Sequence, residues 1–266
     1  MMEPARYGLR GDNGMLRLAE WRDMDGFFVG YESAWDNFEN PSEAPDAISV
    51  TLRRVHWLDA VADRPTRTID LGDAVLEVLD AQGRVMGDYS IWDTRVTLSE
   101  GSVDAAVTGY VGSVPHTRAE WAWDARRPGR PAERNVWAAL PVGEREAWVE
   151  VARMIHFRRI VQTYPVLAEE LHLDGRHVAD LASFFCALGE AVNGPGGYCG
   201  TNITGMSDFL QYANRPAAKR SRLIWHDMSV AERGLARSVD LDGRPIRYLD
   251  LLVRQLTDDG VDIVPA

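Results

Sequence analysis

One short segment of the sequence carries a single carboxylate on a small polar surface. The segment GYCGTNITGMSDFL, 197–210, joins Gly-rich turns to a predicted short helix. At about 100° per residue, one side of this helix is apolar, with Ile203, Met206, Phe209 and Leu210. The other side carries Thr204, Ser207, Asp208 and Gln211. A carboxylate in this setting can make charge-assisted hydrogen bonds to a cation, so this side is either a docking surface or an ordinary solvated face.

The overall charge restricts the partners of such a surface. The chain has 266 residues and a formal net charge of −11, and Lys219 is its only lysine. Nucleic acid is therefore not expected as a direct ligand, because phosphate contacts need clustered cations, whereas a basic protein would be attracted. No apolar run approaches the roughly 20 residues that span a bilayer, and the N-terminus has no signal-peptide pattern. We expect a cytoplasmic protein without a membrane segment.

Other residue types that perform chemistry are scattered. The six histidines occur without an HExxH or HxxxH context, and no GxSxG motif is present. Cys186 and Cys199 are isolated thiols without a CxxC partner, which argues against a disulfide framework or a zinc site. We expect no catalytic residue, no cofactor and no metal.

The first 140 residues predict an antiparallel β domain. Short apolar runs broken by Gly, Asp and Pro predict strands within 27–33, 47–58, 74–93, 94–99 and 103–114. The clearest hairpin pairs Val75–Leu79 with Val85–Tyr89 around a turn that contains Gly83. The Pro- and Arg-rich segment 122–135 predicts an exposed loop.

A helix predicted after this loop connects the two halves of the chain. Trp148, Val151, Ala152 and Ile155 recur at helical spacing, and Pro165 ends the pattern. The predicted organisation is a β-rich domain of residues 1–165, which ends in this connecting helix, followed by a second domain of residues 167–266.

The second domain reads as a small α/β unit. Strands are predicted at 170–175, 222–228 and 261–266, with helices at 178–193, after Asn202, and at 247–259. Alternating strands and helices favour parallel pairing of the strands. The fold class predicted is therefore two-domain, with a β-rich N-terminal domain and a small C-terminal α/β domain.

Several short motifs follow one another in the last hundred residues: LDG at 173–175, a helix through Phe184, Ala187 and Leu188, GYCGTNI at 197–203, LIW at 223–225 and GVDI at 260–263. Their order and spacing resemble the barstar family, the intracellular inhibitors of small secreted ribonucleases. The resemblance implies a three-stranded parallel sheet with helices, preceded here by a β-rich half as in two-domain actinobacterial proteins. It also implies that the loop and second helix enter a nuclease active site and present carboxylates there.

The resemblance assigns roles to individual residues. Asp208 falls where the family has its principal inhibitory aspartate, and Tyr198 falls at an aromatic contact position. Gly200 and Asn202 match the turn that begins the second helix. The implied partner is a basic protein, a secreted ribonuclease or a ribonuclease-type toxin.

Three positions depart from the family pattern. Thr204 replaces a second helix acid, Ser207 replaces a contact tryptophan, and Arg247 aligns with a late acidic contact. A scaffold or regulatory module that has lost nuclease inhibition is therefore an alternative.

A second alternative is a hydrolase in the N-terminal domain. It would use polar residues that lie near one another in sequence, namely Asp93, His116, Glu120 and Asp124.

Overall fold

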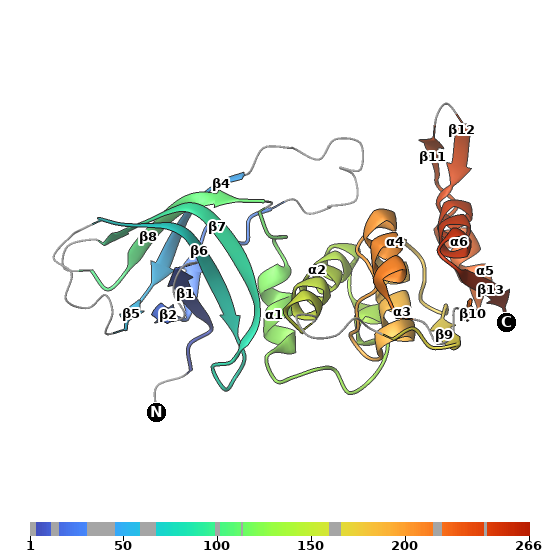
Figure 1. Ribbon diagram of the computed structural model, residues 1–266, viewed down its shortest axis with the longest axis horizontal. Coiled ribbons are helices and arrows are strands. Elements are labelled where there is room, and N and C mark those ends of the chain that lie inside the picture. The colour runs from blue at the N-terminus through green and yellow to red at the C-terminus, as the bar shows by residue number, and fades with distance from the viewer. Residues whose placement is uncertain are drawn as a thin grey trace. The chain divides into compact units, whose positions relative to one another are not determined.

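The computed structural model places two compact units along the chain, Met1–Gly129 and Arg130–Ala266. It describes residues 4–11, 16–30, 46–58, 68–98, 102–112, 114–159, 166–214, 220–241 and 244–266. The first unit contains an eight-stranded antiparallel sheet, and the second contains a three-stranded parallel sheet with helices (Figure 1). The predicted fold class is confirmed.

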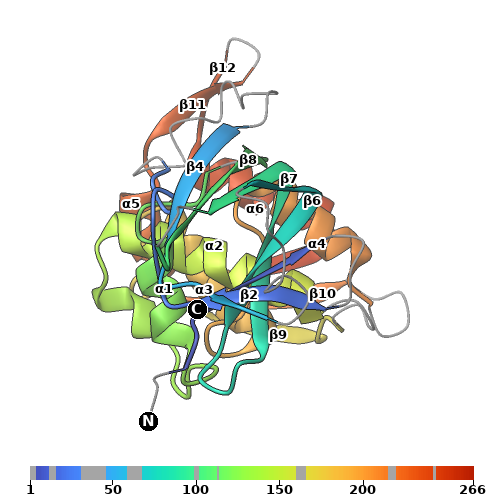
Figure 2. The ribbon, with the colours of Figure 1, turned by 90° about the vertical axis from the view of Figure 1, so that its left-hand side faces the viewer.

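The sheet of the first unit curls on itself. Its strands are β1 Tyr7–Gly11, β2 Arg17–Trp21, β3 Asp23–Asp25, β4 Asp46–Arg53, β5 His56–Trp57, β6 Thr68–Leu79, β7 Val85–Leu98 and β8 Ala105–Val111. They lie in the order β3-β4-β8-β7-β6-β1-β2-β5. Only Arg22 separates β2, near one end of this order, from β3 at the other end. The chain from β2 to β3 therefore joins both ends of the sheet, and the curvature is visible in Figures 1 and 2.

The predicted hairpin is confirmed as the pair β6 and β7. Val75 lies opposite Ser90 and Val78 lies opposite Gly87. In the turn, the Asp80 carboxylate accepts hydrogen bonds from the backbone N–H of Arg84 at 2.9 Å, and Gly83 adopts a φ of 75°. A left-handed residue of this kind favours glycine, which explains why the sequence signal was clear.

The strand predicted at 27–33 is wrong over its described part. Phe27 and Phe28 lie in a bend, and residues 31–33 lie outside the described residues. The apolar run there serves the core in another way, because the fully buried Phe27 ring packs edge-on against Tyr89 at 5.1 Å. Aromatic contacts of this kind need no strand geometry.

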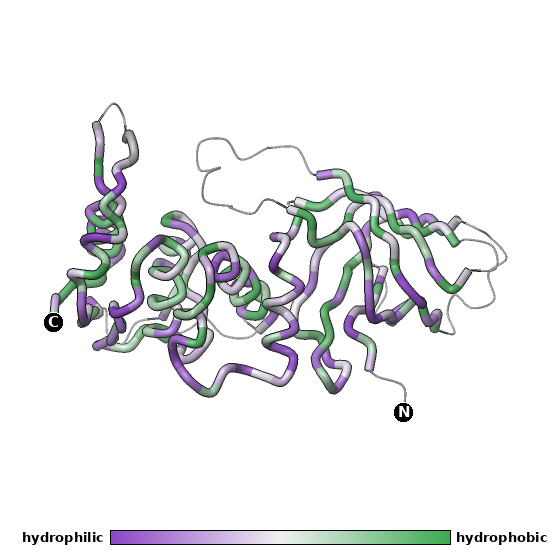
Figure 3. Tube along the Cα trace, turned by 180° about the vertical axis from the view of Figure 1, so that it is seen from behind, coloured by the Kyte–Doolittle hydropathy of each residue, from purple (hydrophilic) through white to green (hydrophobic). Residues whose placement is uncertain are grey.

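The loop predicted at 122–135 is wrong over its first residues. Helix α1, Ala119–Arg126, occupies them, with Trp123 fully buried and its indole N–H donating to the Tyr89 hydroxyl at 2.9 Å. The prolines that suggested a loop lie after this helix, in a connection whose polar character is clear in Figure 3.

The second unit follows the predicted alternation of strands and helices. Its elements are η1 Val136–Ala139, α2 Val142–Arg159, β9 Glu170–Asp174, α3 Leu181–Asn193, α4 Ile203–Tyr212, β10 Ser221–His226, α5 Met228–Gly234, β11 Ser238–Leu241, β12 Arg244–Arg247, α6 Tyr248–Asp258 and β13 Val261–Pro265. The three parallel strands lie in the order β13-β10-β9. The hairpin of β11 and β12 and the helix α5 were not predicted.

The central helix α3 begins three residues later than the sequence pattern suggested. Asp180 caps it, because its carboxylate accepts from the backbone N–H of Ser183 at 2.8 Å while the Ser183 hydroxyl accepts from the Asp180 N–H at 2.9 Å. This reciprocal pair fixes the helix start. The helix then buries Phe184, Phe185 and Leu188.

The predicted connecting helix exists as α2, but it belongs to the second unit. Its Trp148 and Val151 are buried, and α2 packs on α3. Helix α3 is also linked to the segment before η1. Its Glu190 is 3% exposed and accepts a hydrogen bond from the backbone N–H of Asn135 at 2.9 Å. The division after Gly129 thus differs from the boundary near residue 165 that the sequence suggested, because side chains on α3 require η1 and α2 as partners.

We expect a fragment of residues 130–266 to unfold cooperatively by itself. A fragment of residues 167–266 should be less stable by about 2 kcal/mol or more, because it exposes the face of α3 that α2 covers and leaves Glu190 without one of its donors. Urea unfolding followed by circular dichroism measures both. Equal stability of the two fragments would contradict this division.

Candidate functional site

Helix α4 carries most of the predicted binding residues, and the turn before it fixes where it begins. The Asn202 side chain accepts from the backbone N–H of Gly205 at 2.7 Å, as expected of an N-cap residue. Gly200 has a φ of 98°, and a Cβ atom there would lie 2.6 Å from the Met206 backbone. Asn202 therefore fixes the first turn of α4, and Gly200 allows the preceding loop to pack closely against it.

The apolar face of α4 is confirmed. Met206, Phe209 and Leu210 are buried, and Ile203 is half-buried. On the polar face, Thr204, Asp208 and Gln211 are exposed and Ser207 is buried.

Ser207 is buried against α6, whereas Gln211 stays exposed and only its amide group reaches toward α6. Ser207 is 9% exposed and its hydroxyl lies 2.9 Å from a carboxylate oxygen of Asp259. The amide groups of Gln211 and Gln255 donate to the same hydroxyl at 2.9 Å and 3.2 Å. This network ties α4 to α6.

Thr204 and Asp208 remain on the exposed side of α4, one helical turn apart. Among the residues that the structure describes, the Asp208 carboxylate makes no hydrogen bond or ion pair. An exposed carboxylate on a helix that is held at its start and along one side is preorganised to meet a cation.

Tyr198, the aromatic residue that the resemblance assigns to the interface, lies in the interior. It is 5% exposed, and its ring packs against His156 at 5.0 Å, Phe157 at 5.8 Å and Phe209 at 5.9 Å. Burial raises the pKa of Tyr198 to about 12. Its neighbour Cys199 is fully buried, and burial raises the pKa of that thiol as well. Neither side chain is presented to a partner.

Arg247 lies at the end of β12 and is already engaged. Its guanidinium makes two hydrogen bonds to the Asp250 carboxylate, at 2.8 Å and 2.7 Å. Because the pair is exposed and close in sequence, it acts as a local ion pair at the start of α6.

A histidine pair on the parallel sheet was not predicted from the sequence. His172 Nδ1 and His226 Nε2 lie 3.1 Å apart on the neighbouring strands β9 and β10, and His172 Nε2 lies 3.1 Å from Glu170. Strand pairing brings them together from positions far apart in the chain, so only the register could have revealed them. Within the described parts of the chain, no group of three or more His, Cys, Asp or Glu side chains is arranged to hold a metal ion.

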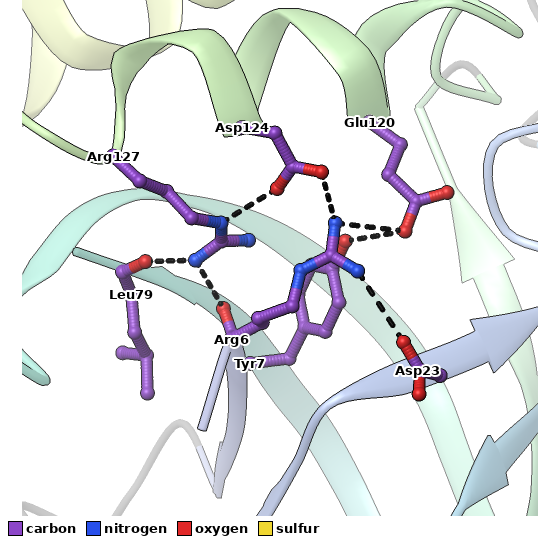
Figure 4. A network of polar contacts seen from close by, with 7 residues as sticks. All are labelled: Arg6, Tyr7, Asp23, Leu79, Glu120, Asp124 and Arg127. Carbon is purple, nitrogen blue, oxygen red and sulfur yellow. Dashed lines mark hydrogen bonds and ion pairs between the residues drawn. The ribbon is translucent and has the colours of Figure 1, made fainter. Parts of the chain in front are cut away.

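The four residues of the hydrolase alternative do not form one cluster in the structure. Glu120 and Asp124 lie together on α1, where both bind Arg6, at 3.2 Å and 2.5 Å (Figure 4). His116 is buried and accepts from the backbone N–H of Arg118 at 3.0 Å, and Asp93 lies at an irregular point of β7. The latter two are not part of the Arg6 network.

The Arg6 network braces α1 against the sheet. The Tyr7 hydroxyl lies 3.0 Å from Glu120, and the guanidinium groups of Arg6 and Arg127 each lie 5.4 Å from the centre of the Tyr7 ring. Arg127 also bonds to the backbone carbonyls of Arg6 and Leu79 (Figure 4).

A hollow of about 370 Å³ adjoins this network. It is lined by Pro4, Ala5, Arg6, Arg22, Asp80, Ala81, Asp124 and Arg127. Its carboxylates are paired with arginines, Asp80 with Arg84 and Asp124 with Arg6 and Arg127. Carboxylates held in this way brace the fold and are poorly placed to exchange a proton with a substrate.

Comparisons with known proteins return no match. No family model matches the chain, and neither the curated proteins nor the solved structures contain a match. No helix in the described parts of the chain is long and apolar enough to cross a membrane. The arrangement of the described side chains is therefore the basis for assigning a function.

Gly200→Ala should destabilise the second unit by about 2 kcal/mol or more, because it adds a left-handed strain and a clash with the Met206 backbone. Gly83→Ala is the matched control, since Gly83 has a φ of 75° and nothing within 4 Å of a Cβ atom. It should cost about 1 kcal/mol from strain alone. Urea unfolding of the full chain compares the two, and equal losses would show that the contact with Met206 is unimportant.

Proposed function

We propose that the second unit binds a basic protein through the exposed side of α4, with Asp208 as the central contact, and that the partner is a ribonuclease or a ribonuclease-type toxin. The observation that carries the proposal is the exposed Asp208 carboxylate, which has no partner among the described residues, on a helix fixed at Gly200, Asn202 and Ser207. A ribonuclease gathers cations around the scissile phosphate, and a carboxylate placed there gains charge-assisted hydrogen bonds.

Two further features support this proposal. The second unit has the order of parallel strands and helices that the barstar resemblance implies, with α4 after the GYCGTNI turn. The first turn of α4 also leaves Thr204 exposed beside Asp208, so a flat partner surface can reach both.

The two units carry different shares of the net negative charge. Residues 1–129 contain 22 acidic and 13 basic residues, whereas residues 130–266 contain 18 acidic and 16 basic residues. Most of the net negative charge therefore belongs to the first unit. Attraction of a basic partner over long distances would come mainly from that unit, and Asp208 would act at short range.

The scaffold alternative is favoured by one observation. Ser207 and Tyr198 are buried, so the exposed side chains of the expected contact set are Thr204, Asp208 and Gln211, of which only Asp208 is charged. A panel of purified small basic ribonucleases, tested in an RNA cleavage assay with and without the protein, separates inhibition from binding alone.

Asp208→Asn should weaken binding to the inhibited ribonuclease by about 2 kcal/mol or more, because it removes the charge that faces the basic site, and it should leave the melting temperature unchanged. Asp262→Asn is the charge-matched control, since Asp262 is a half-exposed aspartate on β13 that pairs only with Arg220 among the described residues. Calorimetric titration measures the affinities. Equal losses for the two variants would place the contact elsewhere.

Thr204→Asp should raise the association rate and make it more sensitive to salt. The new carboxylate would lie in the first turn of α4, where the helix dipole favours it, and would strengthen the local field beside Asp208. Stopped-flow association with the same ribonuclease at about 0.01 M and about 0.1 M salt tests this, because screening lengths differ about threefold between them. An unchanged salt slope would show that the first unit supplies all of the attraction.

A further inference from the structure

Phe157 is a large aromatic side chain that the proposed contact set does not include. It lies near the end of α2, and 53% of it is exposed. Its ring packs against His156 at 5.8 Å and against Tyr198 at 5.8 Å. One part of the ring is thus held by the unit's interior and the rest is open to a ligand.

Phe157 and Asp208 both adjoin Tyr198. The Tyr198 ring, on which Phe157 packs, also touches Phe209, the residue that follows Asp208 on α4. Burial is the largest cause of the raised pKa of Tyr198, and the Asp208 carboxylate lies close enough to the Tyr198 hydroxyl to contribute in the same direction. Tyr198 is therefore a buried neighbour of both the exposed Phe157 ring and the exposed Asp208 carboxylate.

We propose that Phe157 and Asp208 together receive an arginine side chain of the partner protein. The inference rests on the proposed function and adds a residue from outside the barstar-like segment. A guanidinium group can form a bidentate pair with Asp208 while its flat face lies on the Phe157 ring, and a lysine ammonium cannot make both contacts equally well. Phe157 thus supplies the exposed aromatic contact that the buried Tyr198 does not.

Arg153 places a positive charge near Tyr198 and Asp208. It lies one turn before Phe157 on α2, and its charge lowers the pKa of Tyr198, which places it near the same hydroxyl as Asp208. Among the described residues no ion pair of Arg153 with Asp208 is formed. In the free protein Arg153 supplies a nearby cation, and an arriving arginine must compete with its field.

The probes are two peptides of equal length and charge, carboxyfluorescein-(Arg-Gly)5-amide and carboxyfluorescein-(Lys-Gly)5-amide, into which the full chain is titrated while fluorescence anisotropy is followed at low salt. Phe157→Leu keeps an apolar side chain and removes the ring. We expect it to weaken binding of the arginine peptide about three- to tenfold and to leave binding of the lysine peptide within twofold. Tyr110→Leu, at a 43% exposed tyrosine of β8, is the control and should change neither.

Two further variants complete the test. Asp208→Asn should weaken binding of both peptides, because both are cations, and Arg153→Gln should strengthen both about twofold or more. If Phe157→Leu weakens both peptides equally or neither, the arginine contact is overturned.

The ribonuclease panel separates this inference from the proposed function. If no ribonuclease binds but the arginine peptide responds to Phe157→Leu as expected, the arginine site stands and the ribonuclease partner fails. If a ribonuclease binds and loses affinity with Asp208→Asn but not with Phe157→Leu, the partner stands and the role of Phe157 is overturned.

Discussion

Glu190 lies in the interior of the second unit and accepts hydrogen bonds from two backbone N–H groups in different segments, Asn135 at 2.9 Å and Gly196 at 3.0 Å. A carboxylate removed from water is costly unless such donors surround it, so both segments are held where the carboxylate requires them. Asn135 begins the path to η1 and α2, and Gly196 begins the turn toward α4. One side chain thus sets the positions of the two helices that frame the candidate site.

The surface that results is small and held from several sides. Gly200 lets the chain pass close to Met206, Asn202 starts α4, and Ser207 joins α4 to α6 through Asp259. Each of these contacts is internal, and together they leave Asp208 exposed on a helix with little freedom to move. A rigid carboxylate loses little conformational entropy when it meets a cation, so few exposed contacts can still give specific binding.

The sequence predicted those features that depend on local pattern. Strand periodicity and Gly83 indicated the β6 and β7 hairpin, and the alternation in the last hundred residues indicated parallel strands. Features that depend on contacts with a distant part of the chain were not predicted. A helical wheel gives α4 one buried face, but α6 covers another side and takes Ser207 into the interior. Tyr198 is buried for the same reason, because α2 packs over it from an earlier part of the chain.

The curled sheet of the first unit has a consequence for the order in which the protein is made. Tyr7 pairs with Val78, and Ala47 pairs with Tyr110, so β1 lacks a neighbour until β6 has left the ribosome and β4 lacks one until β8 has. Pairings of such long sequence separation form slowly and leave strand edges open meanwhile. In the parallel sheet Arg222 pairs with Glu170 and Ser221 with Val261, which are shorter separations, so the first unit keeps its strand edges open over a longer stretch of translation.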